Sequence, residues 1–463
     1  MQSRFINIVI VFLLGAIGYP LGAQPTPSLP LTLEKAIALT LENNRDIQVA
    51  ELEVKKSRQG VWEAYSHLLP KIDAEGRYTR NIQKPVIFLP PGTPFSPPGG
   101  GQAVLEIGYD NAYLGGVSLS LPIFVQSAFS GISLAKKAAR LQEEALQGTR
   151  SNAIALVKKA YYGVLMARKV YQFMEMSLAS ARENLETIRR MEEQGLVSHY
   201  DKIRAEVQVE NLTPVVMQAH DSYRLALEHL KIQIGLDAST RIEILDSLQY
   251  DSTYKPPTLT DALQQALQAN PVVRQLQISL ELAAARIGLE KASFYPNIVA
   301  FGNYQYQAQA NDFKFSDYNW VQTSMVGVQV QFPLYHGTGR LARVQQAKIE
   351  YQQAKTRLQA VTEAIKIQVQ SALFQVHQAQ KRIAAQRRAI RQAEMGYRIA
   401  RTRYRNGLST QLEVNDAQVA LTQAQVNYAK AVYDFWAART DLENLTGQIV
   451  PEEFLNLENR KEK

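Results

Sequence analysis

Hydrophobic positions in this chain follow two periods that alternate along its length. From Leu31 to Leu69, apolar residues recur three and four positions apart, as in an amphipathic helix. From Lys71 to Thr79 they alternate with charged residues, which is typical of a strand with two unlike faces. The helical pattern then returns over residues 126–194, a length of about 100 Å in one helix. Globular domains rarely use so long a helix.

This order of elements occurs twice. The stretch T-L-E-K-A-I-A-L-T-L-E-N-N from Thr32 returns as T-L-T-D-A-L-Q-Q-A-L-Q-A-N from Thr258. The joint L-P-I-F from Leu121 returns as F-P-L-Y from Phe332. Each half contains a helix, a strand, a loop, a strand, a very long helix, a glycine turn and a final helix. The repeat predicts an internally duplicated architecture.

The same patterns set the predicted boundaries. Residues 1–23 are a signal peptide, 24–250 the first repeat, 251–450 the second repeat and 451–463 a charged tail. The first repeat is predicted to have a helix at 31–69, strands at about 71–84 and 110–122, and helices at 126–194 and 198–235. The second is predicted to have a helix at 258–295, strands at about 297–309 and 320–333, and helices at 337–406 and 409–446. Residues 84–102 are rich in Pro and Gly, which predicts a loop.

The N-terminal residues predict export, and the absence of cysteine excludes thiol chemistry. Arg4, an apolar run over 6–17, and Gly22-Ala23 before Gln24 predict a cleaved secretory signal, with an uncleaved N-terminal anchor as the alternative. The chain contains no cysteine, so disulfides, thiolate metal sites and lipidation of a cysteine are excluded. The net charge of +8 arises from interspersed basic residues, which indicates solvated helix faces rather than a nucleic-acid site.

The alternating strands suggest a membrane sheet. In an exported protein, strands with one apolar face and one polar face are typical of the outer membrane, although a hairpin on a soluble protein is the alternative. Aromatic residues lie near the predicted strand ends: Tyr78, Tyr113, Tyr304, Tyr306 and Trp320. A sheet in lipid must close, and about eight strands make the smallest barrel. Four strands per chain therefore require oligomerisation. Two copies would give eight strands and three copies would give twelve, and the residue patterns fit both.

The duplicated halves, the two L-P-I-F-like joints and the paired turns Gln194–Val197 (Q-G-L-V) and Asn406–Ser409 (N-G-L-S) resemble the TolC family of outer-membrane efflux proteins. The resemblance covers about residues 31–450. It implies a mainly α fold with a small β part: a trimer with a shared twelve-stranded β-barrel, four strands per chain, joined to a periplasmic α-barrel of coiled-coil helices. It also implies a passive exit duct of a tripartite efflux or type I secretion system.

Partners follow from the same resemblance. They are two further copies of the chain, a periplasmic adaptor (membrane fusion protein), an inner-membrane transporter of RND or ABC type, and outer-membrane lipid, with no nucleic acid. A soluble periplasmic coiled-coil adaptor or scaffold is the alternative function. The substrate is not specified, because the transporter and the adaptor select it.

The resemblance also assigns a role to the two glycine turns, which lie at the periplasmic tips of the helical hairpins in the family. It implies that the adaptor docks at Gly195, Leu196 and Val197 and at Gly407, Leu408 and Ser409. The simpler interpretation is that both glycines only terminate helices.

A constriction is implied beside the second turn. Glu413 and Asp416 lie three apart on one helix face and match the family's acidic constriction, where rings of carboxylates would favour cations. A solvated helix face is the alternative. Asp201 and Tyr404 match residues that hold the tip closed. Ser409 stands where the family often has an arginine, so the closing network differs.

No pattern for catalysis is present. The six histidines show no metal-binding spacing, and the sequence has neither a phosphate-binding glycine loop nor a nucleophile elbow. Met174 and Met176 are interpreted as packing residues rather than ligands for a soft metal. We therefore expect no enzymatic activity, cofactor or metal site.

Overall fold

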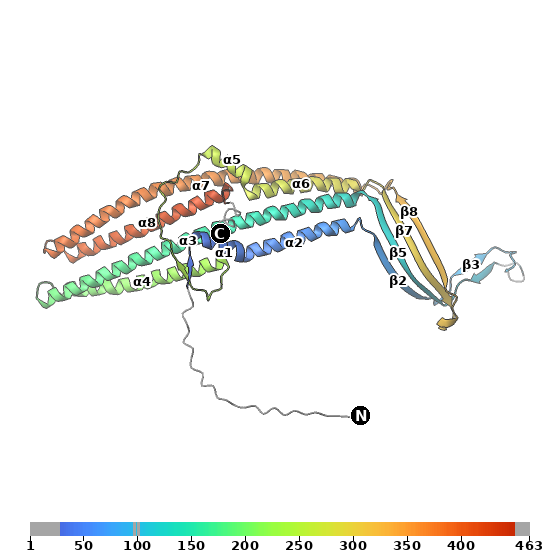
Figure 1. The fold of residues 1–463 in the computed structure, drawn as a ribbon, viewed down its shortest axis with the longest axis horizontal. Helices are drawn as coiled ribbons and strands as arrows, with labels where there is room; N and C mark the ends of the chain where they lie inside the picture. Colours follow the sequence, from blue (N-terminus) through green and yellow to red (C-terminus); the bar gives the residue numbers. More distant parts are fainter. Residues whose placement is uncertain (1–27, 96–98, 100–101, 450–463) are drawn as a thin grey trace, which may run out of the picture.

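The computed structural model describes residues 28–95, 99 and 102–449. Long helices form most of the molecule and a curved sheet forms one end, with a hairpin beyond it (Figure 1). The mainly helical, duplicated fold with a small β part agrees with the prediction. The predicted signal peptide (1–23) and charged tail (451–463) lie outside the described residues.

The elements of the two halves follow one another in similar order. The first half contains β1 (Leu29–Leu31), α1 (Leu33–Asn43), α2 (Arg45–Ser66), β2 (Lys71–Arg80), β3 (Val86–Leu89), β4 (Ala103–Glu106), β5 (Asn111–Val125), α3 (Gln126–Glu193) and α4 (His199–Ile234). The second contains β6 (Ile242–Ile244), α5 (Leu259–Ala269), α6 (Pro271–Ala292), β7 (Asn297–Ala310), the short 3-10 turn η1 (Phe315–Asp317), β8 (Val321–Gln331), α7 (Gly339–Arg405) and α8 (Gln411–Leu445).

Four strands form one antiparallel sheet in the order β2-β5-β7-β8, and the β5–β7 pair joins the two halves. Its register aligns the alternating residues of all four strands. Ile72 pairs with Leu119, Leu119 with Gly302, and Gly302 with Val326, so these residues share one face. Val326 is 89% exposed. The neighbouring row of residues, on the other face, holds Asp73, Ser118 and Asn303. The sheet thus has an exposed apolar face and a polar face.

None of the helices in residues 28–95 and 102–449 combines the length and the apolar character that a bilayer crossing requires.

The predicted helices at 31–69 and 258–295 are wrong as single helices, because each is split in two. Asn44 takes an extended conformation between α1 and α2, and its side-chain oxygen accepts hydrogen bonds from the amides of Asp46 and Ile47. Asn270 does the same between α5 and α6, where Pro271 begins the second helix. An asparagine that caps a new helix competes with continuation of the old one.

The same two asparagines connect each split helix to the end of a long one. The side-chain amide of Asn44 donates to the carbonyl of Gln233 near the end of α4, at 2.8 Å. That of Asn270 donates to the carbonyl of Leu445 at the end of α8, at 3.0 Å. Gly447 has a positive φ of 68°, and a Cβ there would lie 2.7 Å from the carbonyl oxygen of Ala269. The close approach therefore requires glycine.

The predicted loop at 84–102 is also only partly correct. β3 lies within this range and pairs as an antiparallel hairpin with β4, which begins directly after it, and the Pro- and Gly-rich residues connect the two strands. A second unpredicted feature is the two-stranded parallel sheet β1–β6, with three paired residues in each strand. Both were obscured because strands of three or four residues give too few alternations to recognise.

Buried residues concentrate in the middle of the molecule, where α1 and α5 pack against the long helices. Ile37, Ile154, Tyr161, Val369 and Phe435 are all at most 1% exposed. The Tyr161 hydroxyl donates to the Asp246 carboxylate at 2.5 Å, and burial followed by that hydrogen bond raises the pKa of Tyr161. We call this middle region, with its buried core, the equator. Its core holds the connector 236–257 against the long helices.

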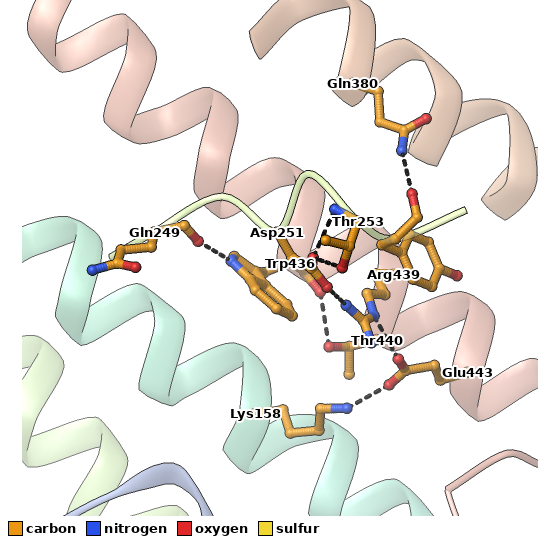
Figure 2. A network of polar contacts seen from close by, with 10 residues as sticks. Lys158, Gln249, Asp251, Thr253, Gln380, Trp436, Arg439, Thr440 and Glu443 are labelled. Atoms are coloured by element: carbon orange, nitrogen blue, oxygen red, sulfur yellow. Dashed lines mark hydrogen bonds and ion pairs between the residues drawn. The ribbon is translucent and has the colours of Figure 1, made fainter. Parts of the chain in front are cut away.

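A polar network holds that connector against α8 (Figure 2). The guanidinium of Arg439 contacts Asp251 at 2.9 Å and Glu443 at 2.8 Å, and it lies 4.1 Å from the ring centre of Tyr254. Lys158 on α3 forms an ion pair with the same Glu443. The Trp436 indole donates to the carbonyl of Gln249 at 2.8 Å. Arg439 therefore links the connector to the long helices of both halves.

Replacing Arg439 should destabilise the equator. Arg439→Gln leaves Asp251 and Glu443 partly buried without their shared cation, and we expect a loss of about 2 kcal/mol. Thermal unfolding of the detergent-solubilised protein, followed by circular dichroism, should show a lower midpoint. Arg391→Gln, at an exposed position on α7, is the control and should change stability by less than about 0.5 kcal/mol. Equal midpoints for the two variants would contradict the role of the network.

Candidate functional site

The two helical hairpins, α3–α4 and α7–α8, end in turns at the same end of the molecule, farthest from the sheet (Figure 1). The turns have the same geometry. Gly195 has a φ of 73°, and the amide of Leu196 donates to the carbonyl of Met191 at 2.8 Å. Gly407 has a φ of 71°, and the amide of Leu408 donates to the carbonyl of Arg403 at 2.8 Å. Both are glycine-terminated helix ends, since other residues tolerate that φ poorly.

Each following helix begins with a matching cap. The Ser198 hydroxyl accepts a hydrogen bond from the amide of Asp201, and the Asp201 carboxylate accepts from the Ser198 hydroxyl at 2.6 Å. In the second tip the Thr410 hydroxyl caps Glu413, whose carboxylate accepts from the Ser409 hydroxyl at 2.8 Å. Asp201 and Glu413 therefore occupy the same third position of their helices, and each carboxylate accepts a hydrogen bond from a serine hydroxyl just before its helix.

Glu413 and Asp416 are exposed on the first turns of α8. The hydrogen bond from Ser409 is the main cause that lowers the pKa of Glu413, and the Thr410 amide and Arg403 contribute. Ser409, predicted as part of the docking turn and as a departure from the family pattern, thus also stabilises the ionised form of Glu413.

Asp201 and Tyr404 do not share a hydrogen bond in this chain. The carboxylate of Asp201 bonds to Ser198, whereas the buried hydroxyl of Tyr404 has no hydrogen-bond partner among the described residues. Tyr404 packs beside Leu185 and Ile188 in the apolar cluster of the tip. Burial, followed by the nearby charge of Asp201, raises the pKa of Tyr404. The two residues are close but form no hydrogen bond with each other.

Three side-chain pairs join the first hairpin to the second above the tips. Ser177 on α3 accepts from Thr422 on α8 at 3.3 Å. The hydroxyls of Ser180 and Tyr397 are 2.9 Å apart. Arg401 donates to Glu183 at 2.9 Å. Ile383, Ile390, Tyr397 and Tyr404 recur at seven-residue intervals, so the shared helix face of the two tyrosines was predictable. The partner residues on α3 had no sequence signal.

Two of these pairs, Ser180–Tyr397 and Glu183–Arg401, line a cavity of about 220 Å³ between the hairpins. Tyr404, Arg405, Met191, Gln208 and Gln418 are among the residues that line it. The buried apolar cluster at this end consists of Leu185, Ile188 and Ala205 and is small, so the tips are packed more loosely than the middle of the molecule. The hairpins can separate at this end at a low cost in buried contacts.

The first tip also has an ionic cluster that the sequence did not reveal. Glu192 lies 2.8 Å from Nδ1 of His199 and 3.1 Å from the ammonium of Lys202. The bond to His199, followed by that to Lys202, lowers the pKa of Glu192. In the second turn the equivalent of Glu192 is Tyr404, so the two tips differ in charge.

Among the described residues, no group of histidine, aspartate and glutamate side chains is arranged to hold a metal ion.

Comparisons with known proteins agree with this architecture. The family model described as "Outer membrane efflux protein" matches residues 36–236 and 262–448, one match in each half. The crystal structure of the Campylobacter jejuni CmeC outer membrane channel superposes with a TM-score of 0.69 at 18% identity. It covers 98% of this chain and 97% of that one. At this identity the match shows the fold alone.

Two curated proteins are related over shorter stretches. The chain is 25% identical over 164 residues to Protein CyaE of Bordetella pertussis, which covers 35% of this chain and 34% of CyaE. It is 24% identical over 245 residues to the alkaline protease secretion protein AprF of Pseudomonas aeruginosa, which covers 52% of this chain and 49% of AprF. The chain therefore spans half or less of the length of the curated relatives it matches.

Weakening the contacts between hairpins should open the tip. Tyr397→Phe combined with Arg401→Ala removes one hydroxyl pair and one exposed ion pair, a loss of about 1 kcal/mol, or about fivefold in the open population. Limited chymotrypsin digestion at the turns should be faster by a similar factor. Arg398→Ala, at an exposed position on the same helix, is the control. Equal digestion rates for the double variant and the control would refute the role of these pairs.

Proposed function

This chain belongs to the outer membrane efflux protein family, and from that premise we propose that it is the outer-membrane exit duct of a tripartite efflux or type I secretion system. It acts as a passive conduit from the periplasm to the exterior, and the inner-membrane transporter supplies the energy. The family match to both halves is the observation that carries this proposal. The exposed apolar face of the sheet supports it, because residues such as Val326 and Val328 fit lipid better than water.

The active unit is a homotrimer. Among the described residues, β2 pairs only with β5 and β8 only with β7, so both edges of the sheet are open. The alternating directions of the four strands make β2 and β8 antiparallel, so β8 of one copy can pair with β2 of the next in the same manner as its other neighbours. Three copies give a closed barrel of twelve strands, as in the family; two would give eight.

The long helices extend into the periplasm and meet the partners there. The turns at 195–197 and 407–409 are the docking points for a periplasmic adaptor, because they are the exposed ends farthest from the sheet. Asp201 and Tyr404 contribute to the closed state. An RND or an ABC transporter completes the system. AprF, which is 24% identical to this chain over 245 residues, is an alkaline protease secretion protein, and this similarity favours the secretion alternative.

A soluble periplasmic scaffold is not favoured. It would expose the apolar rows of four strands to water, together with the unpaired backbone of both edge strands.

The proposal predicts a detergent-extracted trimer that conducts ions. The mature protein should remain with the outer-membrane fraction, migrate as a heat-modifiable trimer, and form channels in planar bilayers. A double variant, Val326→Arg and Val328→Arg, places charges on the apolar face and should abolish membrane insertion at a cost of about 2 kcal/mol or more per residue. A monomer in the soluble periplasmic fraction would refute the proposed function.

Glu413 and Asp416 form acidic rings at the constriction of the trimer. Replacing both with alanine should weaken cation preference, because the six carboxylates of three copies are then lost. Reversal potentials in asymmetric KCl measure the change. Glu394→Ala, which removes an exposed carboxylate farther up α7, is the control and should leave selectivity unaltered. Unchanged selectivity in the double variant would show that these residues do not line the pore.

The cation preference measured in this way should also depend on pH. Since the pKa of Glu413 is lowered, its charge is complete above the usual glutamate range and is lost only as the pH falls through the lowered value. Ser409→Ala removes the main cause and raises that pKa, so cation preference should decline at a higher pH than in the parent protein. Repulsion among the carboxylates of the ring acts in the Ser409→Ala variant and in the parent protein alike, so it does not produce a difference between their pH profiles. Identical pH profiles would contradict the role of Ser409.

A further inference from the structure

The β3–β4 hairpin has an unusual surface for a segment outside the sheet. Val86, Ile87 and Phe88 on β3 are between 40% and 60% exposed, and Val104 and Leu105 on β4 are 56% and 42% exposed. The sequence contains no charged residue between Lys84 and Glu106. Figure 1 shows β3 projecting past the outer end of the sheet. A two-stranded hairpin is only marginally stable by itself, so a surface this apolar indicates a partner.

The hairpin is fixed beside one edge of the sheet. The amide of Asn81 donates to the carbonyl of Asp110 at 2.7 Å, and that of Ile107 donates to the carbonyl of Pro85 at 2.9 Å. The ammonium of Lys84 lies 3.0 Å from the Asp110 carboxylate. These contacts lie directly beyond the outer ends of β2 and β5. Since β2 is an edge strand, the hairpin stands at the seam where another copy must pair.

A second exposed aromatic group lies at the same height, in the connection that leads to the other edge strand, β8. Part of this connection packs over β5 of its own chain, where the ring centre of Phe315 is 5.2 Å from that of Tyr113. Residues 311–320 connect β7 to β8, and within them Phe313 is 56%, Phe315 54% and Trp320 45% exposed. The strand register shows that the hairpin and this connection leave the sheet at the same height, because Arg80 pairs with Asn111 and Asn111 with Ala310, the last residue of β7. Val321, the first residue of β8, pairs with Gln307 nearby.

We propose that the β3–β4 hairpin of one protomer packs against the aromatic β7–β8 connection of the next. The inference rests on the proposed trimer, in which the β2 edge of one copy meets the β8 edge of its neighbour. Ring closure then brings the two apolar groups together at the outer end of each seam. Because β2 and β8 are the opposite edge strands of one chain, a contact across the seam is head-to-tail, as a cyclic ring requires. A second copy fits better than lipid, because the hairpin lies beyond the paired strands.

Cysteine cross-linking tests the contact, and the absence of cysteine from the chain removes any background. Phe88→Cys with Phe313→Cys, and separately Val104→Cys with Trp320→Cys, should form disulfides between protomers when oxidised with copper phenanthroline. The expected result is loss of the monomer band on non-reducing gels for at least one pair. Lys56→Cys with Phe313→Cys is the control, since Lys56 is exposed on α2, far from the sheet's outer end, and this pair should remain monomeric on the gel.

Three outcomes would overturn the proposal. One is an intact trimer by light scattering with no cross-link in either pair. Another is cross-linking of Phe88→Cys alone at the same efficiency, which would identify the neighbouring hairpin as the partner. The third is strong quenching of a bimane label at Phe88→Cys by doxyl-labelled lipid, which would place the hairpin in the membrane. The absence of any trimer would instead refute the proposed function.

Discussion

The open edges of the four-stranded sheet are the constraint on which the rest of this structure depends. β2 and β8 each have backbone groups without a partner along one side over ten or eleven residues. In a membrane each unpaired group costs several kcal/mol, so the sheet is stable there only when other copies complete it. Because β5 continues directly into α3 at Val125–Gln126, closing the sheet also arranges the helices around the same axis.

The helical part has a gradient of stability along its length. At the equator, the paired asparagines, the Arg439 network and the largest buried side chains join both halves. Near the tips, the core is reduced to Leu185, Ile188 and Ala205 with a few partly buried neighbours, and a cavity separates the hairpins. A firmly packed middle with loosely packed ends permits the tips to move while the barrel and the equator keep their shape. That distribution suits a duct that opens at one end.

Sequence patterns predicted the features that repeat over many residues. The duplication, the alternating strands and the two glycine turns are of this kind, and the register places the expected apolar positions on one face. The features that were missed depend on single residues or on distant partners. Asn44 and Asn270 interrupt helices whose periodicity continues across them. Asp251 and Arg439 are 188 residues apart, and nothing local marks them as a pair. At the tips, Asp201 and Glu413 were both identified from the sequence, but the hydroxyl that donates to each carboxylate became evident only from the structure.

The β5–β7 pair has a consequence for the history of the chain. It is antiparallel, as the proposed pair between β8 and the next copy's β2 would be, so the junction between the two halves resembles the junction between two chains. A single half carries one strand hairpin, one long helical hairpin and two open edges. Six such units would close a ring with the same number of strands. Gene fusion would then have replaced half of the intermolecular seams with covalent ones and freed the two halves to diverge, as the different charges of their tips show.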